Sequence, residues 1–373
     1  MNLRILIISG LNVDAGYGGE IWIKEVATRL AMSNDVVVLT TVNGPRNTNF
    51  AEIMRNSAIE IIEIDLKNAV KSFLTVSKYF RGADIVYYLS YGIPFKAALV
   101  FAQQMFRIPV VNGHHSDPFD KIDVYHKNEK VSDKIMRIFN DLVDKYFKAH
   151  HVENEEDKVK LENKAFFNVY KIPLGIDIEF YKPMEKYSKF TITWIGRLDE
   201  TKGADLLPQI IDLLFSNHDI TEEIDFVIAG DGVLRDIIRA LSNKFASVKY
   251  LGFISDGKKQ ELMAKSHVLI STSRAETFPQ TGLQAIACGT PVIYFDIRGP
   301  REFIIPGKNG YLASDVLEFT QHIKTIFENW QKGSYDSFSI ESRKISEKFN
   351  VNEMVTKIGK MIESIIQMSF KNT

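Results

Sequence analysis

Residues 267–295 read HVLISTSRAETFPQTGLQAIACGTPVIYF. The opening run, HVLISTS (267–273), is apolar and rich in β-branched residues, a pattern typical of a strand buried on both faces. A polar loop follows, and a helix is predicted from near Thr281 to about Cys288. PVIYF (291–295) predicts the next strand. A strand, a helix and a strand in this order predict a parallel βαβ unit.

The same alternation continues on the N-terminal side of this unit. Further strands are predicted at 3–10, 35–41, 59–64, 84–90 and 108–115, and again at 190–196, 224–230 and 248–253. Helices are predicted at 20–33, 95–106, 127–148 and 351–368. Strands that alternate with helices predict an α/β fold with a doubly wound parallel sheet in each half of the chain.

The length of the chain predicts more than one domain. It has 373 residues, of which 45% are hydrophobic and 25% charged, as in soluble globular proteins. A single core rarely grows this large. We expect a Rossmann-like domain over 1–177, a second over 178–350, and a final helical segment over 351–373. Because ligands bind at the carboxyl ends of the strands in such sheets, we expect the two domains to face each other across a deep cleft.

Composition and motifs disfavour several function classes. The net charge of -1 gives no basic field for nucleic acid. A single cysteine, Cys288, excludes an intrachain disulfide and fits a reducing compartment; we expect it to be a small buried residue. No cleavage site of a signal peptide is visible and every apolar run is strand-length, so a cytoplasmic protein is expected. There is no G-x-G-x-x-G and no P-loop motif, which removes the main warrant for a dinucleotide oxidoreductase or a P-loop NTPase.

The loop and helix within 274–288 have the features of an anion site. The first backbone N–H groups of a helix are unpaired and its dipole is positive at that end, which suits a phosphate. Glu276 lies before this point and Gln284 in the first turn beyond it. They are therefore placed to hold polar groups on either side of a bound phosphate, as in a sugar joined to a nucleotide. The alternative is a solvated loop residue and an ordinary helix residue.

A second loop, RLDETKG (197–203), brings two cations to the same edge of the second sheet. Arg197 follows a predicted buried strand and Lys202 comes shortly before the next helix. Arginine offers a planar fork for two phosphate oxygens, and lysine a mobile point charge. Cations aimed at a diphosphate would stabilise the charge that builds on it as a leaving group. The alternative is that both are solvated surface residues.

In the first half, the loop GYGG (16–19) precedes a helix, so its glycines allow a ligand to approach the backbone closely. His114 and His115 follow a predicted strand; a histidine there can donate to a sugar hydroxyl, accept a proton from an acceptor, or simply be held structurally at the strand end. His150 and His151 lack further metal ligands at a recognisable spacing. No Asp-x-Asp pair, a common holder of a divalent ion on a diphosphate, is present.

Seven segments, in the same order, resemble the group 1 glycosyltransferases, which are retaining glycosyltransferases of family 4 with the GT-B fold. The segments are GYGGEIWIKEVATRLA (16–31), KIPLGIDIEFYKP (171–183), WIGRLDETKGADLL (194–207), VIAGDGVLRDIIRAL (227–241), KYLGFIS (249–255), STSRAETFPQTGLQAIACGTPVI (271–293) and GPREFIIPGKNGYL (299–312). The similarity covers nearly the whole chain.

This resemblance implies a role for each candidate residue. Arg197 and Lys202 would bind the donor diphosphate, Glu276 would lie at the donor sugar, and His115, or His114 in its place, would lie near the transferred sugar. The remaining donor-binding residues would be Gly18, Gly19, Phe253, Phe278, Thr281, Gly282 and Gln284. The resemblance also implies no metal and no cofactor, a UDP- or GDP-linked sugar as donor, and retention of the anomeric configuration.

Gln284 departs from the family's pattern, which has a second acid at this position. A carboxylate accepts bonds from both hydroxyls of a ribose, whereas an amide accepts with its oxygen and donates with its nitrogen. Neutral hydrogen bonds contribute about 0.5–1.5 kcal/mol, against about 1.5–3 for bonds to charged groups. We therefore expect weaker or altered ribose binding and intact chemistry at Glu276.

Three functions remain open: an active glycosyltransferase, an epimerase or phosphorylase of the same fold, and a sugar-nucleotide-binding protein with impaired catalysis. The acceptor would be a hydroxyl of a glycan or of a lipid-linked glycan. The stretch LKNAVKSFLTVSKYFRG (66–82) carries apolar and basic residues at helical spacing. It predicts either a helix packed on the first sheet or one that docks on the inner face of an anionic membrane. Oligomeric state is not predicted.

Overall fold

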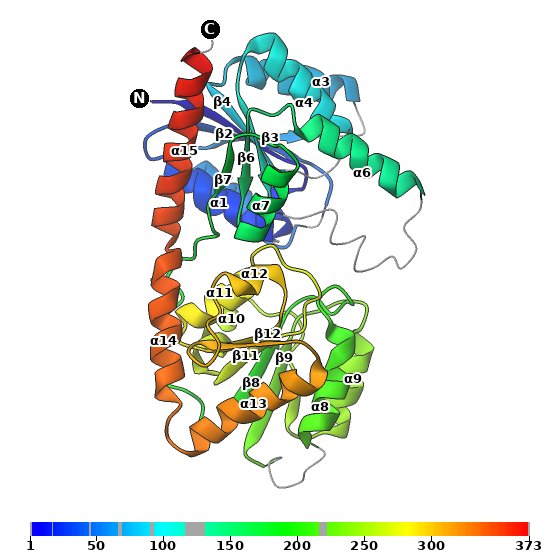
Figure 1. The fold of residues 1–373 in the computed structure, drawn as a ribbon, viewed down its shortest axis with the longest axis vertical. Coiled ribbons are helices and arrows are strands. Elements are labelled where there is room, and N and C mark those ends of the chain that lie inside the picture. Colours follow the sequence, from blue (N-terminus) through cyan, green and yellow to red (C-terminus); the bar gives the residue numbers. More distant parts are fainter. Residues whose placement is uncertain are drawn as a thin grey trace. The chain divides into compact units, whose positions relative to one another are not determined.

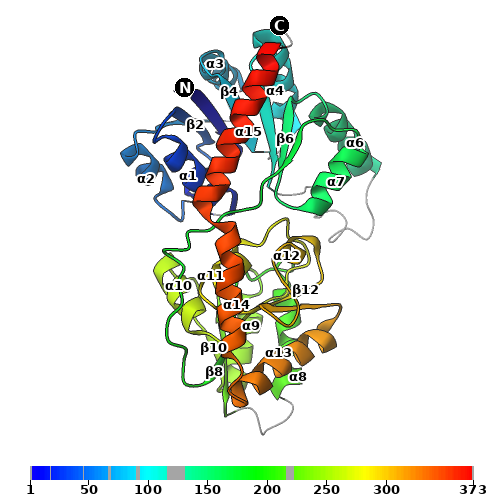
Figure 2. The same ribbon diagram turned by 60° about the vertical axis from the view of Figure 1, so that its left-hand side comes forward.

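The computed structural model describes residues 2–16, 18–44, 46–65, 69–89, 93–115, 131–215 and 222–371. The chain divides into two compact units. The first consists of Met1–Leu174 together with Val351–Thr373, and the second of Gly175–Asn350. Each unit has its own parallel sheet, with helices on both faces (Figure 1, Figure 2).

The first unit contains seven strands in the order β3-β2-β1-β4-β5-β6-β7, all parallel. The strands are β1 (Arg4–Ser9), β2 (Asp35–Thr41), β3 (Glu60–Ile64), β4 (Ile85–Leu89), β5 (Val110–His114), β6 (Ala149–Val152) and β7 (Val169–Lys171). The helices are η1 (Val13–Ala15), α1 (Gly18–Leu30), α2 (Phe50–Asn56), α3 (Ala69–Arg81), α4 (Ile93–Phe106), α6 (Val131–Asp144), α7 (Glu155–Asn163) and α15 (Val351–Lys371).

Alternate residues of β1 face opposite sides of this sheet, as the period of two in a strand requires. Leu6 and Ile8 pack in a cluster with Phe80 of α3 and Leu99 of α4. On a different part of the sheet, Trp22 of α1 lies against Tyr87 of β4, with ring centroids 4.8 Å apart. Because both faces are covered, the strands are apolar along their whole length, which is why the sequence shows runs and no alternation.

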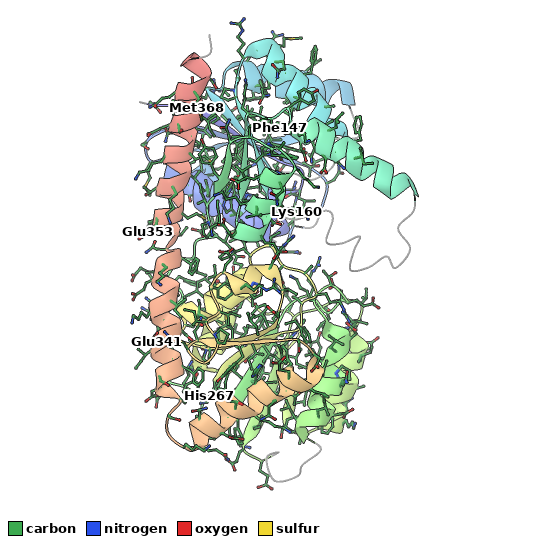
Figure 3. All side chains as sticks on the ribbon, in the orientation of Figure 1. Phe147, Lys160, His267, Glu341, Glu353 and Met368 are labelled. Carbon is green, nitrogen blue, oxygen red and sulfur yellow. The ribbon has the colours of Figure 1, made fainter. Side chains whose placement is uncertain are left out.

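The C-terminal helix α15 belongs to the first unit, where it packs on α1. Its apolar positions recur at helical spacing and are buried: Met354, Ile358, Met361, Ile362 and Ile365. Arg29 of α1 donates from Nε to the Asn352 side-chain oxygen at 2.9 Å. Glu353 and Met368, labelled in Figure 3, mark the course of the helix.

The second unit contains six parallel strands in the order β10-β9-β8-β11-β12-β13. They are β8 (Phe190–Ile195), β9 (Ile224–Ala229), β10 (Val248–Tyr250), β11 (Val268–Ser271), β12 (Val292–Phe295) and β13 (Gly310–Ala313). The helices are η2 (Ala204–Leu206), α8 (Leu207–Phe215), α9 (Arg235–Lys244), α10 (Asp256–Lys265), α11 (Gln280–Ala287), α12 (Arg298–Arg301), α13 (Val316–Gln331), α14 (Asp336–Ser346) and η4 (Glu347–Phe349).

The strand order of the second unit reverses between β8 and β11, which pair directly with Leu269 opposite Thr193. Such a reversal separates the loops that follow the two strands and is where open α/β sheets bind ligands. The two loops are those that carry Arg197 with Lys202 and Glu276. The predicted α/β fold with two doubly wound parallel sheets is confirmed.

Several elements differ from the predicted ones. Strand β13 was not predicted, because a four-residue edge strand shows no apolar run. The strand predicted at 267–273 ends at Ser271, since the next side chain, Thr272, turns to donate a hydrogen bond to the carbonyl of Lys202 at 2.9 Å. The helix predicted at 127–148 is described from Val131 to Asp144, and residues 127–130 lie outside the described residues.

The stretch 66–82 forms α3 from Ala69, and residues 66–68 lie outside the described residues. Phe80 is fully buried and Val76 nearly so, both against the first sheet, whereas Leu74 is 63% exposed. The described apolar residues of α3 therefore serve mainly the core. Within the described ranges, no helix combines the length and apolarity needed to cross a bilayer.

Candidate functional site

In the second unit, the side chains of Lys202 and Glu276 meet. Lys202 Nζ lies 2.6 Å from Glu276 Oε1, and the two side chains are 29% and 16% exposed. Lys202 is in the loop after β8 and Glu276 in the loop after β11, so the adjacency of these two strands brings them together. The structure thus places the cation expected at a diphosphate in contact with the acid expected at the donor sugar.

The backbone of Lys202 is fixed on both sides. Its N–H donates to Asp199 Oδ1 at 3.0 Å, and its carbonyl accepts from the Thr272 hydroxyl at 2.9 Å. Thr272 in turn accepts from the indole N–H of Trp194 at 3.0 Å. These bonds fix the backbone of Lys202 and leave its side chain to contact Glu276.

Gly203, next to Lys202, is required by geometry. Its φ of +65° lies in the left-handed region, and a Cβ at this position would come within 2.0 Å of the Thr272 carbonyl oxygen. Only glycine avoids both the strained conformation and the clash. The close approach of the two loops therefore depends on this residue.

Arg197 is half exposed, and its Nη2 lies 3.2 Å from Asp199 Oδ2. The same carboxylate accepts the N–H of Lys202. Asp199 therefore links the arginine to the lysine loop. Both cations follow β8, at the carboxyl edge of the sheet, where the sequence predicted them.

Helix α11 begins at Gln280 after Pro279, whose side chain makes no capping hydrogen bond. The N–H of Gly282 donates to the Pro279 carbonyl at 3.1 Å, so the amides of Gln280 and Thr281 are those that helix geometry leaves to an outside acceptor. Gly282 is buried, and a Cβ there would lie 2.8 Å from the Tyr294 hydroxyl. Its glycine serves the close packing of α11 on β12.

The remaining donor-binding candidates of this unit lie at different depths. Gln284 is only 3% exposed within α11. Phe278 is 5% exposed and packs against Phe303 and Phe349, with ring centroids 5.8 and 5.7 Å apart. Phe253, after β10, is 73% exposed. The structure thus makes Phe278 part of the core of the unit, leaves Phe253 available to a ligand, and gives Gln284 a small accessible surface.

In the first unit, Gly18 opens α1 and is exposed, and a Cβ there would meet nothing within 4 Å. Gly19 is half-buried. The glycine that the backbone requires is Gly16, whose φ is +75° and whose Cβ would lie 2.6 Å from Thr48 Cγ2. Tyr17 lies outside the described residues.

His115 belongs to a buried chain of hydrogen bonds that the sequence did not reveal. His115 Nδ1 lies 2.8 Å from Glu153 Oε1, and its Nε2 lies 2.9 Å from the Tyr87 hydroxyl. That hydroxyl also lies 2.5 Å from His151 Nδ1, and His151 Nε2 lies 2.8 Å from the Ile172 carbonyl oxygen. The side chains of His115 and Glu153 are each 5% exposed.

The carbonyl at the end of this chain fixes the direction of every bond in it. A carbonyl oxygen only accepts, so His151 carries its proton on Nε2. Burial, aided by the charge of His115, lowers the pKa of His151 to about 3, so its Nδ1 is a bare acceptor for the Tyr87 O–H. Burial, aided by the charge of Glu153, raises the pKa of Tyr87 well above its usual value.

The Tyr87 oxygen must then accept from His115, which carries a proton on Nε2. A second proton lies between His115 Nδ1 and Glu153. Both ring nitrogens of His115 are therefore engaged by protein groups, and His115 is a donor in this arrangement. Acting as a base would require breaking one of these bonds.

His114 and His150 form a separate pair, with His114 Nε2 3.1 Å from His150 Nδ1. The Asn112 amide nitrogen lies 3.4 Å from the same Nε2, which makes that nitrogen an acceptor. Burial is the main cause that lowers the pKa of His114 well below its usual value, and it lowers that of His150 to about 3. Neutral His114 therefore carries its proton on Nδ1, as a donor.

Within the described residues, no three His, Cys, Asp or Glu side chains gather in a group that suits a metal ion. His150 and His151, the pair considered in the sequence, face different networks. Adjacent residues of β6 point to opposite faces of the sheet, so the two rings cannot share a ligand.

Several residues of these sites were missed from the sequence: Glu153, Tyr87, Asp199 and Thr272. Asp199 and Thr272 stand in the quoted motifs, so their position was visible and only their partners were not. Tyr87 lies within an apolar strand and gives no signal of its own. A polar residue directly after a strand, as at Glu153, was the one usable signal.

Residues 189–329 match the family model described as "Glycosyl transferases group 1". Over 202 residues the chain is 25% identical to the UDP-N-acetylglucosamine--peptide N-acetylglucosaminyltransferase GtfA subunit of Streptococcus pneumoniae, covering 52% of this chain and 40% of that protein. Over 171 residues it is 29% identical to a GDP-mannose-dependent alpha-(1-6)-phosphatidylinositol dimannoside mannosyltransferase of Mycobacterium tuberculosis, covering 43% and 44%. The chain thus spans less than half the length of these curated relatives.

Among solved structures, the chain is similar to Alr3699/HepE of Anabaena in complex with UDP and glucose. The TM-score is 0.77 and the sequence identity 18%, and the match covers 97% of this chain and all of that one. Sucrose-phosphate synthase of Thermosynechococcus elongatus matches with a TM-score of 0.77 at 15% identity, over 98% of this chain and all of that one. The predicted GT-B fold is confirmed by these likenesses.

Proposed function

Because residues 189–329 match the model of the group 1 glycosyltransferases, we propose that the chain transfers a sugar from a nucleoside-diphosphate sugar to a hydroxyl of a glycan or lipid-linked acceptor. The observation that carries this proposal is the contact between Lys202 and Glu276. In a sugar nucleotide the sugar and its phosphate are adjacent, so a cation for the phosphate and an acid for the sugar must be adjacent as well.

We propose that each group acts on one part of the donor. Arg197 and Lys202 bind the diphosphate and stabilise the charge that it gains as the bond to the anomeric carbon breaks. The amides of Gln280 and Thr281 at the start of α11 bind a phosphate oxygen. Glu276 binds the sugar near the reacting carbon. Gln284 contacts the ribose, and Phe253 lies near the base.

The finer mechanism is part of the same proposal. The acceptor oxygen forms a bond to the anomeric carbon on the face from which the diphosphate leaves, and the hydroxyl proton passes to a departing phosphate oxygen. This route retains the anomeric configuration and needs neither a metal nor a protein base. His115 is engaged on both ring nitrogens, which fits a reaction without a histidine base; His114, with its proton on Nδ1, is the better donor toward a sugar hydroxyl.

The donor and acceptor classes rest on the relatives. The names of two relatives give UDP-N-acetylglucosamine and GDP-mannose as donors, one acting on a peptide and the other on a phosphatidylinositol mannoside. We propose UDP- or GDP-sugars as donors for this chain, a cytoplasmic location, and an acceptor selected by the first unit. Peripheral contact with a membrane is a weaker proposal, and lack of co-sedimentation with anionic liposomes at low salt would remove it.

The test is an assay of the full chain with labelled UDP-, GDP- and ADP-sugars, with and without glycan and glycolipid acceptors. Transfer or hydrolysis that Glu276→Ala abolishes, with retention at the anomeric carbon and in the presence of EDTA, supports the proposal. Donor binding without turnover for any acceptor supports a sugar-nucleotide-binding protein instead. This outcome is worth testing because Gln284 stands where the family's pattern has a second acid. Conversion of the donor to an epimer, or phosphorolysis, would assign a different reaction.

A further inference from the structure

Arg274 lies two residues before Glu276 and does not point toward it. Its guanidinium makes two parallel bonds to the carboxylate of Asp205, from Nη1 to Oδ1 at 2.7 Å and from Nη2 to Oδ2 at 2.6 Å. Nη1 also donates to the carbonyl of Glu200, and the backbone N–H of Arg274 donates to the carbonyl of Thr201 at 3.1 Å. One residue of the loop after β11 therefore binds three residues of the loop after β8.

These three partners stand on both sides of Lys202 in the chain. Glu200 and Thr201 precede it, and Asp205 lies in η2, the turn just before α8. Arg274 thus grips the turn that carries Lys202 from either end, while Thr272 binds the Lys202 carbonyl between them. The planar fork of arginine suits this task, because it can bind a carboxylate with two parallel bonds and a carbonyl with the same nitrogen.

We propose that Arg274, held to Asp205, is a positioning residue that sets Lys202 for the diphosphate of the donor. It does so without touching the donor, by fixing the turn 200–205 relative to Glu276. The proposal rests on the proposed function, and it deepens that function by assigning Arg274 and Asp205 specifically to recognition of the second phosphate.

The predicted consequence is selective. A residue that merely stabilised the unit would, when replaced, weaken binding of every ligand of the site. Replacing a residue that positions Lys202 weakens the binding of only those ligands that contact Lys202. Removal of Arg274 should therefore weaken a nucleoside diphosphate and spare the corresponding nucleoside and monophosphate.

The experiment measures dissociation constants by calorimetry for the full chain and its variants. The probes are uridine, UMP and UDP, and the guanosine series if GDP binds the wild type more tightly than UDP. For Arg274→Gln we expect roughly a 10-fold to 100-fold loss for the diphosphate, the size of effect expected when a bond between Lys202 and a charged phosphate is weakened or lost. The nucleoside and monophosphate should change less than twofold. Arg274→Lys, which keeps the charge and loses the fork, should fall between.

Two further variants make the result decisive. Asp205→Asn should reproduce the loss through the other half of the pair, and it serves in place of Arg274→Gln if that variant fails to fold. Lys202→Ala combined with Arg274→Gln should bind the diphosphate no more weakly than Lys202→Ala alone. Arg46→Gln is the matched control: it removes an arginine whose Nη2 lies 3.2 and 3.1 Å from the two carboxylate oxygens of Glu63 in the first unit, and it should change nothing.

Equal losses for nucleoside, monophosphate and diphosphate, or additive losses in the double variant, would overturn the role of Arg274 while leaving the proposed function standing. So would unchanged binding of the diphosphate. A wild type that binds none of UDP, GDP and ADP would overturn both, and the two failures are therefore distinguishable.

Discussion

His114 and His115 are neighbours in the chain, yet they enter different hydrogen-bond networks. His115 joins Glu153 and Tyr87, whereas His114 joins His150. The directions of these bonds follow from groups that can only accept or only donate, and they give each ring a definite proton. The hydrogen bonds that its two ring nitrogens already make therefore limit the role that a candidate catalytic histidine can take.

This arrangement predicts a spectroscopic signature for His115. In the wild type at pH 7, nitrogen NMR of labelled histidine should show His115 protonated on Nε2 and sharing a proton at Nδ1, and His151 protonated on Nε2 alone. Glu153→Gln replaces the carboxylate that faces Nδ1 by an amide, so the signal of the proton shared at Nδ1 should change while Nε2 keeps its bond to Tyr87. Glu156→Gln, a change to an exposed acid of α7, is the control. A bare Nε2 on His115 in the wild type would contradict the assignment.

Gly203 offers a second prediction at the scale of one residue. Gly203→Ala places a side chain where φ is +65° and where the Thr272 carbonyl is 2.0 Å away. We expect a loss of about 1–3 kcal/mol in the free energy of unfolding, measured by urea denaturation, together with reduced donor binding because Lys202 moves. Gly257→Ala, where a Cβ would meet nothing within 4 Å, should leave both quantities nearly unchanged.

At the scale of elements, the second unit is held together by side chains that bind the ends of helices. Arg343 of α14 donates from Nη1 to the carbonyls of Ile178, Tyr181 and Ala287, at 3.1, 2.8 and 2.8 Å. Ala287 is the last residue of α11, so its carbonyl has no partner within the helix. The Arg343 guanidinium therefore caps the C-terminal end of α11, the helix whose N-terminal end is the candidate anion site. It also binds residues 178 and 181, near the start of the second unit.

Replacing Arg343 tests this linkage. Arg343→Met keeps much of the apolar stem and removes the donors, which leaves three carbonyls to find other partners. We expect the free energy of unfolding of the second unit to fall by about 2 kcal/mol, with greater hydrogen exchange in α11 and in 178–181. Lys344→Met, on the neighbouring and exposed residue, should have no such effect. Unchanged exchange in α11 would show that the bond to Ala287 contributes little.

The segment 184–189 shows the same principle with a buried lysine. Lys186 donates from Nζ to the Ser266 carbonyl at 2.8 Å and to the Thr290 hydroxyl at 2.7 Å. Burial lowers its pKa to about 7. This polar stretch is thus bound, at Lys186, to the C-cap residue of α10 and to the loop that follows α11.

At the scale of the whole molecule, the two units differ in the number of described histidines whose pKa is lowered by burial. Burial lowers the pKa of His150 and His151, in the first unit, to about 3, and lowers that of His114 well below its usual value. In the second unit His267, labelled in Figure 3, stacks on Phe190 and its pKa is lowered to about 3, again chiefly by burial. Among the histidines that the structure describes, the first unit thus contains three such rings and the second unit one.

Acid should therefore destabilise the first unit more steeply. Between the unfolded value of about 6.5 and the folded values near 3, the unfolded chain binds more protons. Stability is then lost as pH falls through this window, by up to about 1.4 kcal/mol per pH unit for each histidine. Hydrogen exchange at pH 7 and pH 5, corrected for intrinsic rates, should show β4 to β6 losing protection before β8 to β12. The reverse order would contradict the pKa directions.

The sequence by itself determined the alternation of strands and helices, the parallel sheets, and the loops in which Arg197, Lys202 and Glu276 lie. It could do so because apolar runs, glycines and helix starts are local signals. The strand β13 escaped because four residues at a sheet edge produce no such signal. The burial of Phe278, which is 5% exposed, was not visible in the sequence either, since position in a motif does not reveal depth.

Only the tertiary structure decided which side chains meet. Lys202 reaches Glu276, and Arg274 reaches Asp205, because β8 pairs with β11, and strand order is a property of the whole sheet that no segment encodes alone. His114 and His115 enter different networks because residues at a strand end turn to different neighbours. Those neighbours come from β4, from β6 and from the residue that follows β6, and β4 and β6 are far apart in the chain. Contacts between distant segments depend on the assembled fold, whereas the elements themselves follow from the order of residues.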